Sequence, residues 1–91
     1  IFPNQLHLIR SVKICETAVH PLTFQKRITL TGTIINNSSQ IIFFVTGENK
    51  SKILTDILNP SDRSSSFPAA YIKPINGKLS WYLDKDAALL L

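Results

Sequence analysis

Two basic residues stand where they could bind an anion. Lys50 ends the segment Val45-Thr-Gly-Glu-Asn-Lys50, in which a glycine separates an apolar run from a helical pattern. A strand that enters a helix through a glycine turn exposes backbone N–H groups without intrahelical partners, and the helix dipole adds about half a positive charge there. Lys50 would add a full charge, and Arg27, at the start of the preceding strand, a planar set of donors. The pair predicts recognition of a phosphorylated molecule, because neither residue performs chemistry by itself.

The elements that would position this pair alternate between strand and helix. Residues 27–30 are predicted to form a strand, and 41–46 is a continuously apolar run, typical of a strand that is covered on both faces of a parallel sheet. Between 49 and 58 the apolar residues recur at helical period, which predicts a helix that Asn59-Pro60 ends. Strands that alternate with short helices indicate an α/β layer fold.

On the amino-terminal side of these elements, polar and apolar residues alternate over 9–14. This alternation predicts a strand with Val12 and Ile14 facing inward. The segment 34–40 is expected to hold a short helix or an irregular turn, because its Asn and Ser residues favour helix caps over helix interiors.

On the carboxy-terminal side, 70–75 is predicted to form a further strand. A tight turn at Asn76-Gly77 would connect it to an antiparallel or offset neighbour at 79–83. Asp84 is expected to cap a terminal helix over 85–91.

The composition argues against binding to nucleic acid. A chain of 91 residues makes one small domain, and 44% hydrophobic with 18% charged residues predicts a packed interior. The formal charge of +4 comes from ten Lys and Arg against six Asp and Glu. These basic residues are scattered, whereas nucleic-acid binding usually needs a clustered basic face.

Metal, cofactor and thiol chemistry are not expected either. The single cysteine, Cys15, cannot form an internal disulfide and has no evident activating partner, so it is expected to be a structural or surface thiol. His7 and His20 do not form a ligand cluster at zinc spacing, and both are expected to be loop or surface residues.

The termini and the apolar content bear on location and partners. No apolar stretch approaches the roughly 20 residues needed to cross a bilayer, and the amino end lacks a secretion signal, so a soluble cytoplasmic protein without a membrane partner is predicted. The chain has no Met and opens with Ile1-Phe2-Pro3, so it is expected to begin inside something larger. Its few strands cannot hide all their apolar faces, so a missing amino-terminal part or a second copy is expected to cover them.

Several ordered motifs resemble the carboxy-terminal part of the 6-phosphogluconolactonases, in the wider family that includes glucosamine-6-phosphate deaminase. Ile1-Phe2-Pro3 resembles the tail of the family's Gly-His-Thr-Ala-Ser-x-Phe-Pro motif, Arg27-Ile-Thr-Leu-Thr31 its Arg-Ile-Thr-Leu-Thr strand, and Asn36 the asparagine that follows. The segment that ends at Lys50 is similar to the Gly-x-x-Lys turn, and Phe67-Pro68-Ala69-Ala70 to the Leu-Pro-Ala segment. Leu79-Ser-Trp-Tyr-Leu-Asp84 resembles the closing Leu-Thr-Trp-x-x-Asp motif, which favours lactonase over deaminase, although Ser80 replaces the usual threonine.

The resemblance implies a fold, an activity and roles for residues. The chain would be the carboxy-terminal portion, 1–91, of a larger three-layer domain with a partial Rossmann-like sheet flanked by helices. The complete protein would hydrolyse 6-phosphogluconolactone to 6-phosphogluconate in the pentose phosphate pathway, without a metal or organic cofactor. The catalytic base would be a histidine upstream of Ile1, so this chain alone would be inactive and would hold the sugar phosphate through Lys50 and Arg27.

Two other functions remain open at the level of sequence. One is an amino-sugar-phosphate deaminase or isomerase, which could share the same phosphate site. The other is a non-catalytic module that binds a sugar phosphate in a regulatory role.

Overall fold

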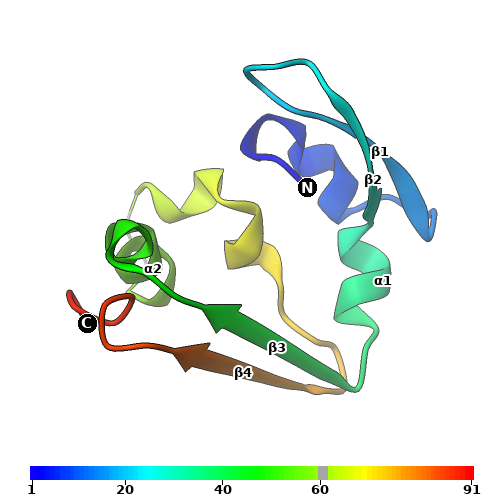
Figure 1. The fold of residues 1–91 in the computed structure, drawn as a ribbon. Helices are drawn as coiled ribbons and strands as arrows, with labels where there is room; N and C mark the ends of the chain where they lie inside the picture. The colour runs from blue at the N-terminus through cyan, green and yellow to red at the C-terminus, as the bar shows by residue number, and fades with distance from the viewer. Residues whose placement is uncertain (60–61) are drawn as a thin grey trace.

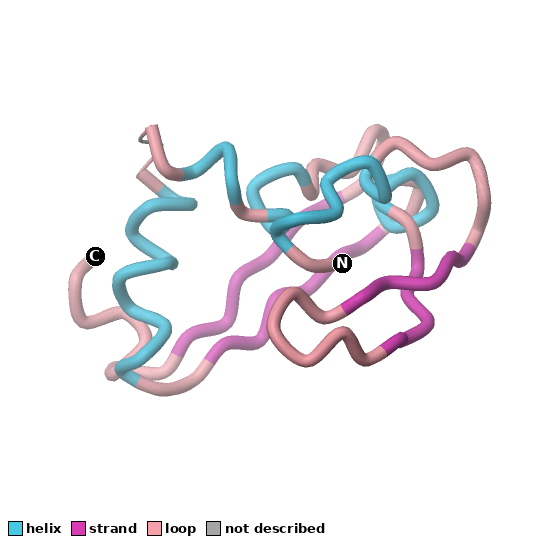
Figure 2. The backbone as a smooth tube through the Cα atoms, turned by 90° about the horizontal axis from the view of Figure 1, so that it is seen from above, coloured by secondary structure: helices cyan, strands magenta, loops and turns pink. Residues whose placement is uncertain are grey.

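The structure is a computed structural model that describes residues 1–59 and 62–91. In chain order its elements are a 3-10 helix at Pro3–Ile9, β1 (Cys15–Val19), β2 (Lys26–Leu30), α1 (Gly32–Asn36), β3 (Gln40–Val45), a 3-10 turn at Glu48–Lys50, α2 (Ser51–Leu58), 3-10 turns at Ser64–Ser66 and Pro68–Tyr71, and β4 (Lys78–Leu83). The strands form two separate two-stranded sheets, one of β1 and β2 and one of β3 and β4 (Figure 1). Seen from above, α2 lies at one end of the molecule and the β1–β2 hairpin at the other (Figure 2).

The first sheet is an antiparallel hairpin, in which the strand predicted at 27–30 is confirmed as β2. The strand predicted over 9–14 is wrong. The amino-terminal 3-10 helix runs to Ile9 and buries Leu8 and Ile9, whereas Val12 is 94% and Ile14 is 64% exposed. The alternating pattern therefore spans the end of a helix and an exposed connection, which have no common face.

The second sheet pairs β3 with β4 in parallel, in a register that matches Gln40 with Lys78 and Val45 with Leu83. The strand predicted at 79–83 is confirmed as β4, but the strand predicted at 70–75 is wrong, and so is the antiparallel or offset pairing between the two. The backbone of this segment is bound by α1 instead of a neighbouring strand, because the N–H groups of Lys73 and Ile75 donate to the side-chain and main-chain oxygens of Asn36.

The expectation that 41–46 is covered on both faces is not met within the described residues. Phe43 stacks on Trp81 of β4, with ring centroids 4.2 Å apart and planes 13° apart, so the aromatic side chains on that face pack against each other. On the opposite face Ile42 is 50% and Phe44 is 79% exposed. A parallel strand usually has both faces covered, so this sheet presents an apolar face without a cover inside the described chain.

The predicted helices are confirmed in part. A short helix forms at α1, where Thr31 caps the amino end, and α2 covers most of the helix predicted at 49–58. Pro60, which was expected to end that helix, lies outside the described residues. The carboxy-terminal residues 85–90 form consecutive turns and not the predicted helix, although Asp84 Oδ1 does accept a capping bond of 2.7 Å from the Ala87 N–H.

The core is small, and most of its side chains come from helices and turns. Its buried apolar residues are Leu8, Ile9, Ala18, Leu54, Ile72 and Ala87. Ala18 of β1 is the one strand residue among them, and no residue of β2, β3 or β4 is fully buried within the described chain. Among the described residues, no helix has the length and apolarity needed to cross a membrane.

Candidate functional site

The candidate site lies where the parallel strands β3 and β4 end. Because the strands are parallel and in register up to Val45 and Leu83, their carboxyl ends meet at one edge. Thr46 and Gly47 follow β3 and lead into the 3-10 turn and α2, whereas Asp84 follows β4. In open α/β sheets, ligands bind at this carboxyl edge.

The turn that carries Lys50 depends on Gly47. Gly47 has φ of 98°, which lies in the left-handed region and favours glycine. The Lys50 N–H donates to the Gly47 carbonyl over 3.2 Å, and the Ser51 hydroxyl donates to the Glu48 carbonyl over 2.7 Å. These bonds fold the chain back on itself and place Lys50 directly before the first residue of α2.

One backbone donor of this turn is already used inside the protein. The Gly47 N–H lies 3.2 Å from each carboxylate oxygen of Asp84. The sequence pattern predicted that the glycine turn would present its N–H groups to a phosphate. In the structure, the anion that accepts a hydrogen bond from the Gly47 N–H is the Asp84 carboxylate.

An apolar cavity of about 400 Å³ lies between β3, α2 and the 3-10 turn at Pro68–Tyr71. It is lined by Phe43, Phe44, Val45, Thr46, Lys50, Ile53, Leu54, Ile57, Ala69 and Trp81. Lys50 is the single ionisable side chain in this lining among the described residues. The volume of the cavity is in the range of small-molecule sites, which usually combine apolar walls with a few polar groups.

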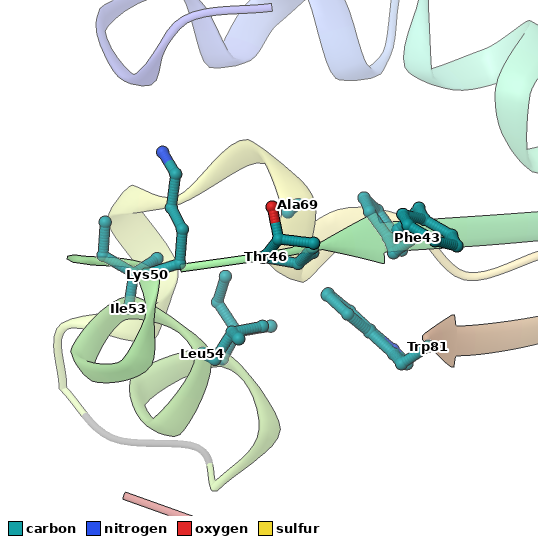
Figure 3. Close-up of a pocket in the computed structure, with 10 residues that line it drawn as sticks. Phe43, Thr46, Lys50, Ile53, Leu54, Ala69 and Trp81 are labelled. Carbon is teal, nitrogen blue, oxygen red and sulfur yellow. The ribbon is translucent and has the colours of Figure 1, made fainter. Parts of the chain in front are cut away.

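The ammonium of Lys50 points away from the packed end of this cavity. In Figure 3 the Lys50 side chain extends away from Leu54 and Trp81, and the hydroxyl of Thr46 is directed to the same side. Both residues are exposed, and no carboxylate pairs with Lys50 within residues 1–59 and 62–91. Thr46 is a polar group at this edge that the sequence reasoning missed, because nothing in the sequence shows on which side of the strand end it lies.

Arg27 has its contacts on the hairpin and on the amino-terminal segment. Its Nη2 donates to Gln25 Oε1 over 3.2 Å, and its Cζ lies 6.0 Å from the centre of the Phe2 ring. Arg27 is not among the described residues that line the Lys50 cavity, and β2 lies well away from α2 in both Figure 1 and Figure 2. No contact in the described chain joins the two predicted cations, so their joint grip on one phosphate stays a prediction.

The histidines and the cysteine lie outside the cavity. His20 Nδ1 accepts N–H bonds from Leu22 and Thr23, and its ring packs against Phe2 with centroids 5.1 Å apart, which is a structural role in the hairpin loop. His7 and Cys15 are exposed. The described residues contain no group of three or more His, Cys, Asp and Glu side chains that could hold a metal ion.

Comparison with known proteins places these features in a family. The family model of glucosamine-6-phosphate isomerases/6-phosphogluconolactonase matches residues 1–81. The 6-phosphogluconolactonase of Aggregatibacter actinomycetemcomitans is 40% identical over 91 residues, which are 100% of this chain and 39% of that protein. The 6-phosphogluconolactonase of Homo sapiens is 42% identical over 92 residues, covering 100% of this chain and 35% of that protein. The chain therefore spans less than two fifths of the length of these relatives.

Solved structures agree with the sequence matches. The crystal structure of devB protein superposes with a TM-score of 0.82 at 30% identity and covers 89% of this chain and 34% of that chain. The 6-phosphogluconolactonase of Trypanosoma brucei has a TM-score of 0.82 at 24% identity, covers 100% of this chain and 36% of that chain, and supports the fold alone. The predicted α/β class with a partial Rossmann-like sheet and the predicted resemblance are both confirmed. The chain belongs to the glucosamine-6-phosphate isomerase/6-phosphogluconolactonase family.

Proposed function

We propose that this chain supplies the phosphate-binding lysine of a 6-phosphogluconolactonase, which hydrolyses 6-phosphogluconolactone to 6-phosphogluconate. The observation that carries the proposal is the position of Lys50, at the mouth of a cavity that lies at the carboxyl edge of β3. The names of the relatives that match the whole chain support the activity. A cytoplasmic location remains a prediction from the sequence.

The chemistry divides between binding and proton transfer. Hydrolysis of a lactone requires a base that takes a proton from water and donors that stabilise the oxyanion. The described lining of the cavity offers one ionisable group, Lys50, which is a cation suited to a phosphate. We therefore assign this chain to substrate binding and leave the base to the histidine that the resemblance places outside the sequence. Binding a phosphate remote from the reacting carbonyl uses its binding energy to orient the sugar ring.

Arg27 is a second candidate for the phosphate. Its guanidinium is exposed on β2 and is held by an uncharged partner, Gln25, so its charge is not neutralised by that contact. A ligand that reaches both cations would have to span the space between the hairpin and α2 (Figure 1). Because nothing in the described chain joins the two residues, their contributions should be tested separately.

The test is Lys50→Ala in the natural protein that contains this sequence, with Lys52→Ala, two residues further along in α2, as the matched control. Lys52 is exposed and is not part of the cavity lining. We expect Lys50→Ala to raise the KM for 6-phosphogluconolactone and the Kd for 6-phosphogluconate by about 10- to 100-fold, because hydrogen bonds to charged groups contribute about 1.5–3 kcal/mol. Lys52→Ala should change neither. An unchanged KM in Lys50→Ala would contradict the proposal, and Arg27→Ala, measured alongside, decides whether Arg27 contributes.

The sugar specificity needs its own experiment, because the family model covers both isomerases and lactonases. A ligand that binds the folded state preferentially raises the melting temperature by mass action. We expect 6-phosphogluconate to raise the Tm of the natural protein more than glucosamine 6-phosphate at the same concentration. A larger rise in Tm with glucosamine 6-phosphate would favour the hypothesis that the protein is a deaminase.

A further inference from the structure

We infer that Asp84, the residue that follows β4, is a positioning residue that holds the turn carrying Lys50. The inference rests on the proposed role of Lys50 in phosphate binding. The sequence predicted that Asp84 caps a terminal helix. In the structure its carboxylate accepts the Ala87 N–H of a carboxy-terminal turn and also contacts Gly47, which follows the neighbouring strand β3.

A continuous pair of hydrogen bonds links Asp84 to the backbone of Lys50. Both carboxylate oxygens of Asp84 lie 3.2 Å from the Gly47 N–H, and the Gly47 carbonyl accepts the Lys50 N–H over 3.2 Å. The two bonds flank the same glycine. The Asp84 contact restrains the peptide plane before Gly47 and the Lys50 bond restrains the plane after it, so together they limit rotation about Gly47.

Gly47 is the residue at which such a restraint has the most effect. Its φ of 98° is one of many conformations open to glycine, so the residue alone does not define the direction in which the chain leaves β3. The lysine side chain is itself flexible, so holding its Cα in place lowers the entropy cost of bringing its ammonium to a phosphate. Asp84 therefore restricts the turn at its glycine, where the backbone has the widest choice of conformations.

Asp84 is held in turn by its own neighbours. Its Oδ1 accepts the Ala87 N–H over 2.7 Å, its carbonyl accepts the Ala88 N–H over 3.1 Å, and its N–H donates to the Val45 carbonyl over 3.3 Å. Ala87 is fully buried, so this carboxy-terminal turn is anchored in the core. These contacts with Val45 and with the carboxy-terminal turn orient the Asp84 carboxylate toward Gly47.

The location of Asp84 separates it from direct contact with a ligand. It lines a smaller hollow of about 270 Å³ together with Phe44, Thr46, Tyr82 and Leu83, and it is not among the described residues that line the Lys50 cavity. A carboxylate at the phosphate itself would repel it, whereas a carboxylate that acts through Gly47 can order the turn from outside the cavity.

The experiment is a double-mutant cycle in the natural protein that contains this sequence. The variants are Asp84→Ala, Lys50→Ala and the double variant, and the readout is the Kd for 6-phosphogluconate together with KM and kcat for the lactone. We expect Asp84→Ala to raise Kd and KM roughly three- to tenfold, with kcat changed less, and to add almost nothing when Lys50 is already alanine, because residues that act as a unit are not additive. A residue with a merely structural role would lower the affinity equally in both backgrounds.

Two further variants keep the test decisive. Asp84→Asn retains an oxygen that can accept the Gly47 N–H, so it should recover most of the affinity lost in Asp84→Ala, and it serves as the test variant if Asp84→Ala does not fold. Asp86→Asn removes the same charge from an exposed carboxylate for which the described residues provide no side-chain hydrogen bond, and it should leave Kd unchanged.

The outcomes distinguish the two proposals. Equal losses from Asp84→Ala with and without Lys50 would overturn the positioning role while leaving the phosphate role of Lys50 intact. No loss in Lys50→Ala itself would overturn the phosphate role and with it the inference about Asp84. A non-additive cycle with recovery in Asp84→Asn supports both.

Discussion

At the scale of single residues, short polar side chains bind backbone segments that are distant in sequence. Asp84 reaches Gly47, 37 residues away, and Asn36 reaches both the 3-10 turn at Pro68–Tyr71 and the residues that follow it. The amide of Asn36 donates from Nδ2 to the Tyr71 carbonyl over 3.2 Å and accepts at Oδ1 the Lys73 N–H over 2.8 Å. An asparagine suits this position because it offers one donor and one acceptor on the same group.

Replacing Asn36 tests this arrangement. Asn36→Asp keeps an acceptor for Lys73 but turns the donor for the Tyr71 carbonyl into an oxygen, so two acceptors would face each other. We expect the free energy of unfolding of the natural protein to fall by about 1–3 kcal/mol, as for a lost partner of a partly buried polar group, measured by urea unfolding. Asn37→Asp is the control, because Asn37 is the exposed neighbour and the same charge is introduced there. Equal losses in both variants would show that charge, and not the pair of hydrogen bonds, is responsible.

At the scale of elements, the register of β3 and β4 is fixed at the ends where the two strands begin. Gly77 precedes β4, and its backbone passes so close to the backbone of 38–39 that a Cβ added there would overlap the Ser38 and Ser39 carbonyl oxygens. The Lys78 N–H donates to the Ser39 carbonyl over 3.0 Å at the same place. This close approach brings β4 beside β3 and so sets which residues, including Asp84, meet the carboxyl end of β3.

Gly77→Ala should therefore weaken the pairing of these strands. The added methyl group must displace backbone atoms, which cannot move as easily as a side chain, so we expect a loss of more than about 1 kcal/mol of stability and a lower Tm. Thermal unfolding monitored by circular dichroism measures it. Asn76→Ala, which alters the exposed neighbour, should have a much smaller effect. If Gly77→Ala melted at the same temperature as the parent, the close approach would not control the register.

At the scale of the whole molecule, the chain exposes more surface than its mass requires. Its accessible surface is 6418 Å², whereas a compact monomer of this mass exposes about 5,300 Å². The radius of gyration is 13.6 Å against about 12 Å for a compact domain of this length. The outer face of the β3–β4 sheet contributes Ile42, Phe44 and Tyr82 to this surface. That another part of the protein or a second copy covers this face stays a prediction.

A polar substitution on this face tests whether it is covered. Phe44→Ser should lower the free energy of unfolding of the natural protein by about 3 kcal/mol if Phe44 is buried there, as for other large-to-small changes in cores. Leu22→Ser is the matched control, because Leu22 is an exposed apolar residue of the loop between β1 and β2. This loop lies away from the β3–β4 sheet (Figure 1). Urea unfolding measures both. A change within about 0.5 kcal/mol for Phe44→Ser, as is usual at exposed sites, would show that the face is open to solvent.

The sequence by itself determined the family, the cores of β2, β3 and β4, and the helix that follows Lys50. These features depend on local order, such as the β-branched residues of β2, the apolar run of β3 and the helical period of α2, all of which act between neighbours in sequence. The tertiary structure alone decided that β4 pairs with β3 in parallel, that 70–75 is bound by Asn36 and not by a strand, and that Asp84 takes the Gly47 N–H. It also separated Arg27 from the cavity of Lys50. The strand pairing and the contacts of Asn36 and Asp84 depend on backbone groups that lie far apart in sequence, and hydrophobic periodicity carries no information about which distant partner satisfies them.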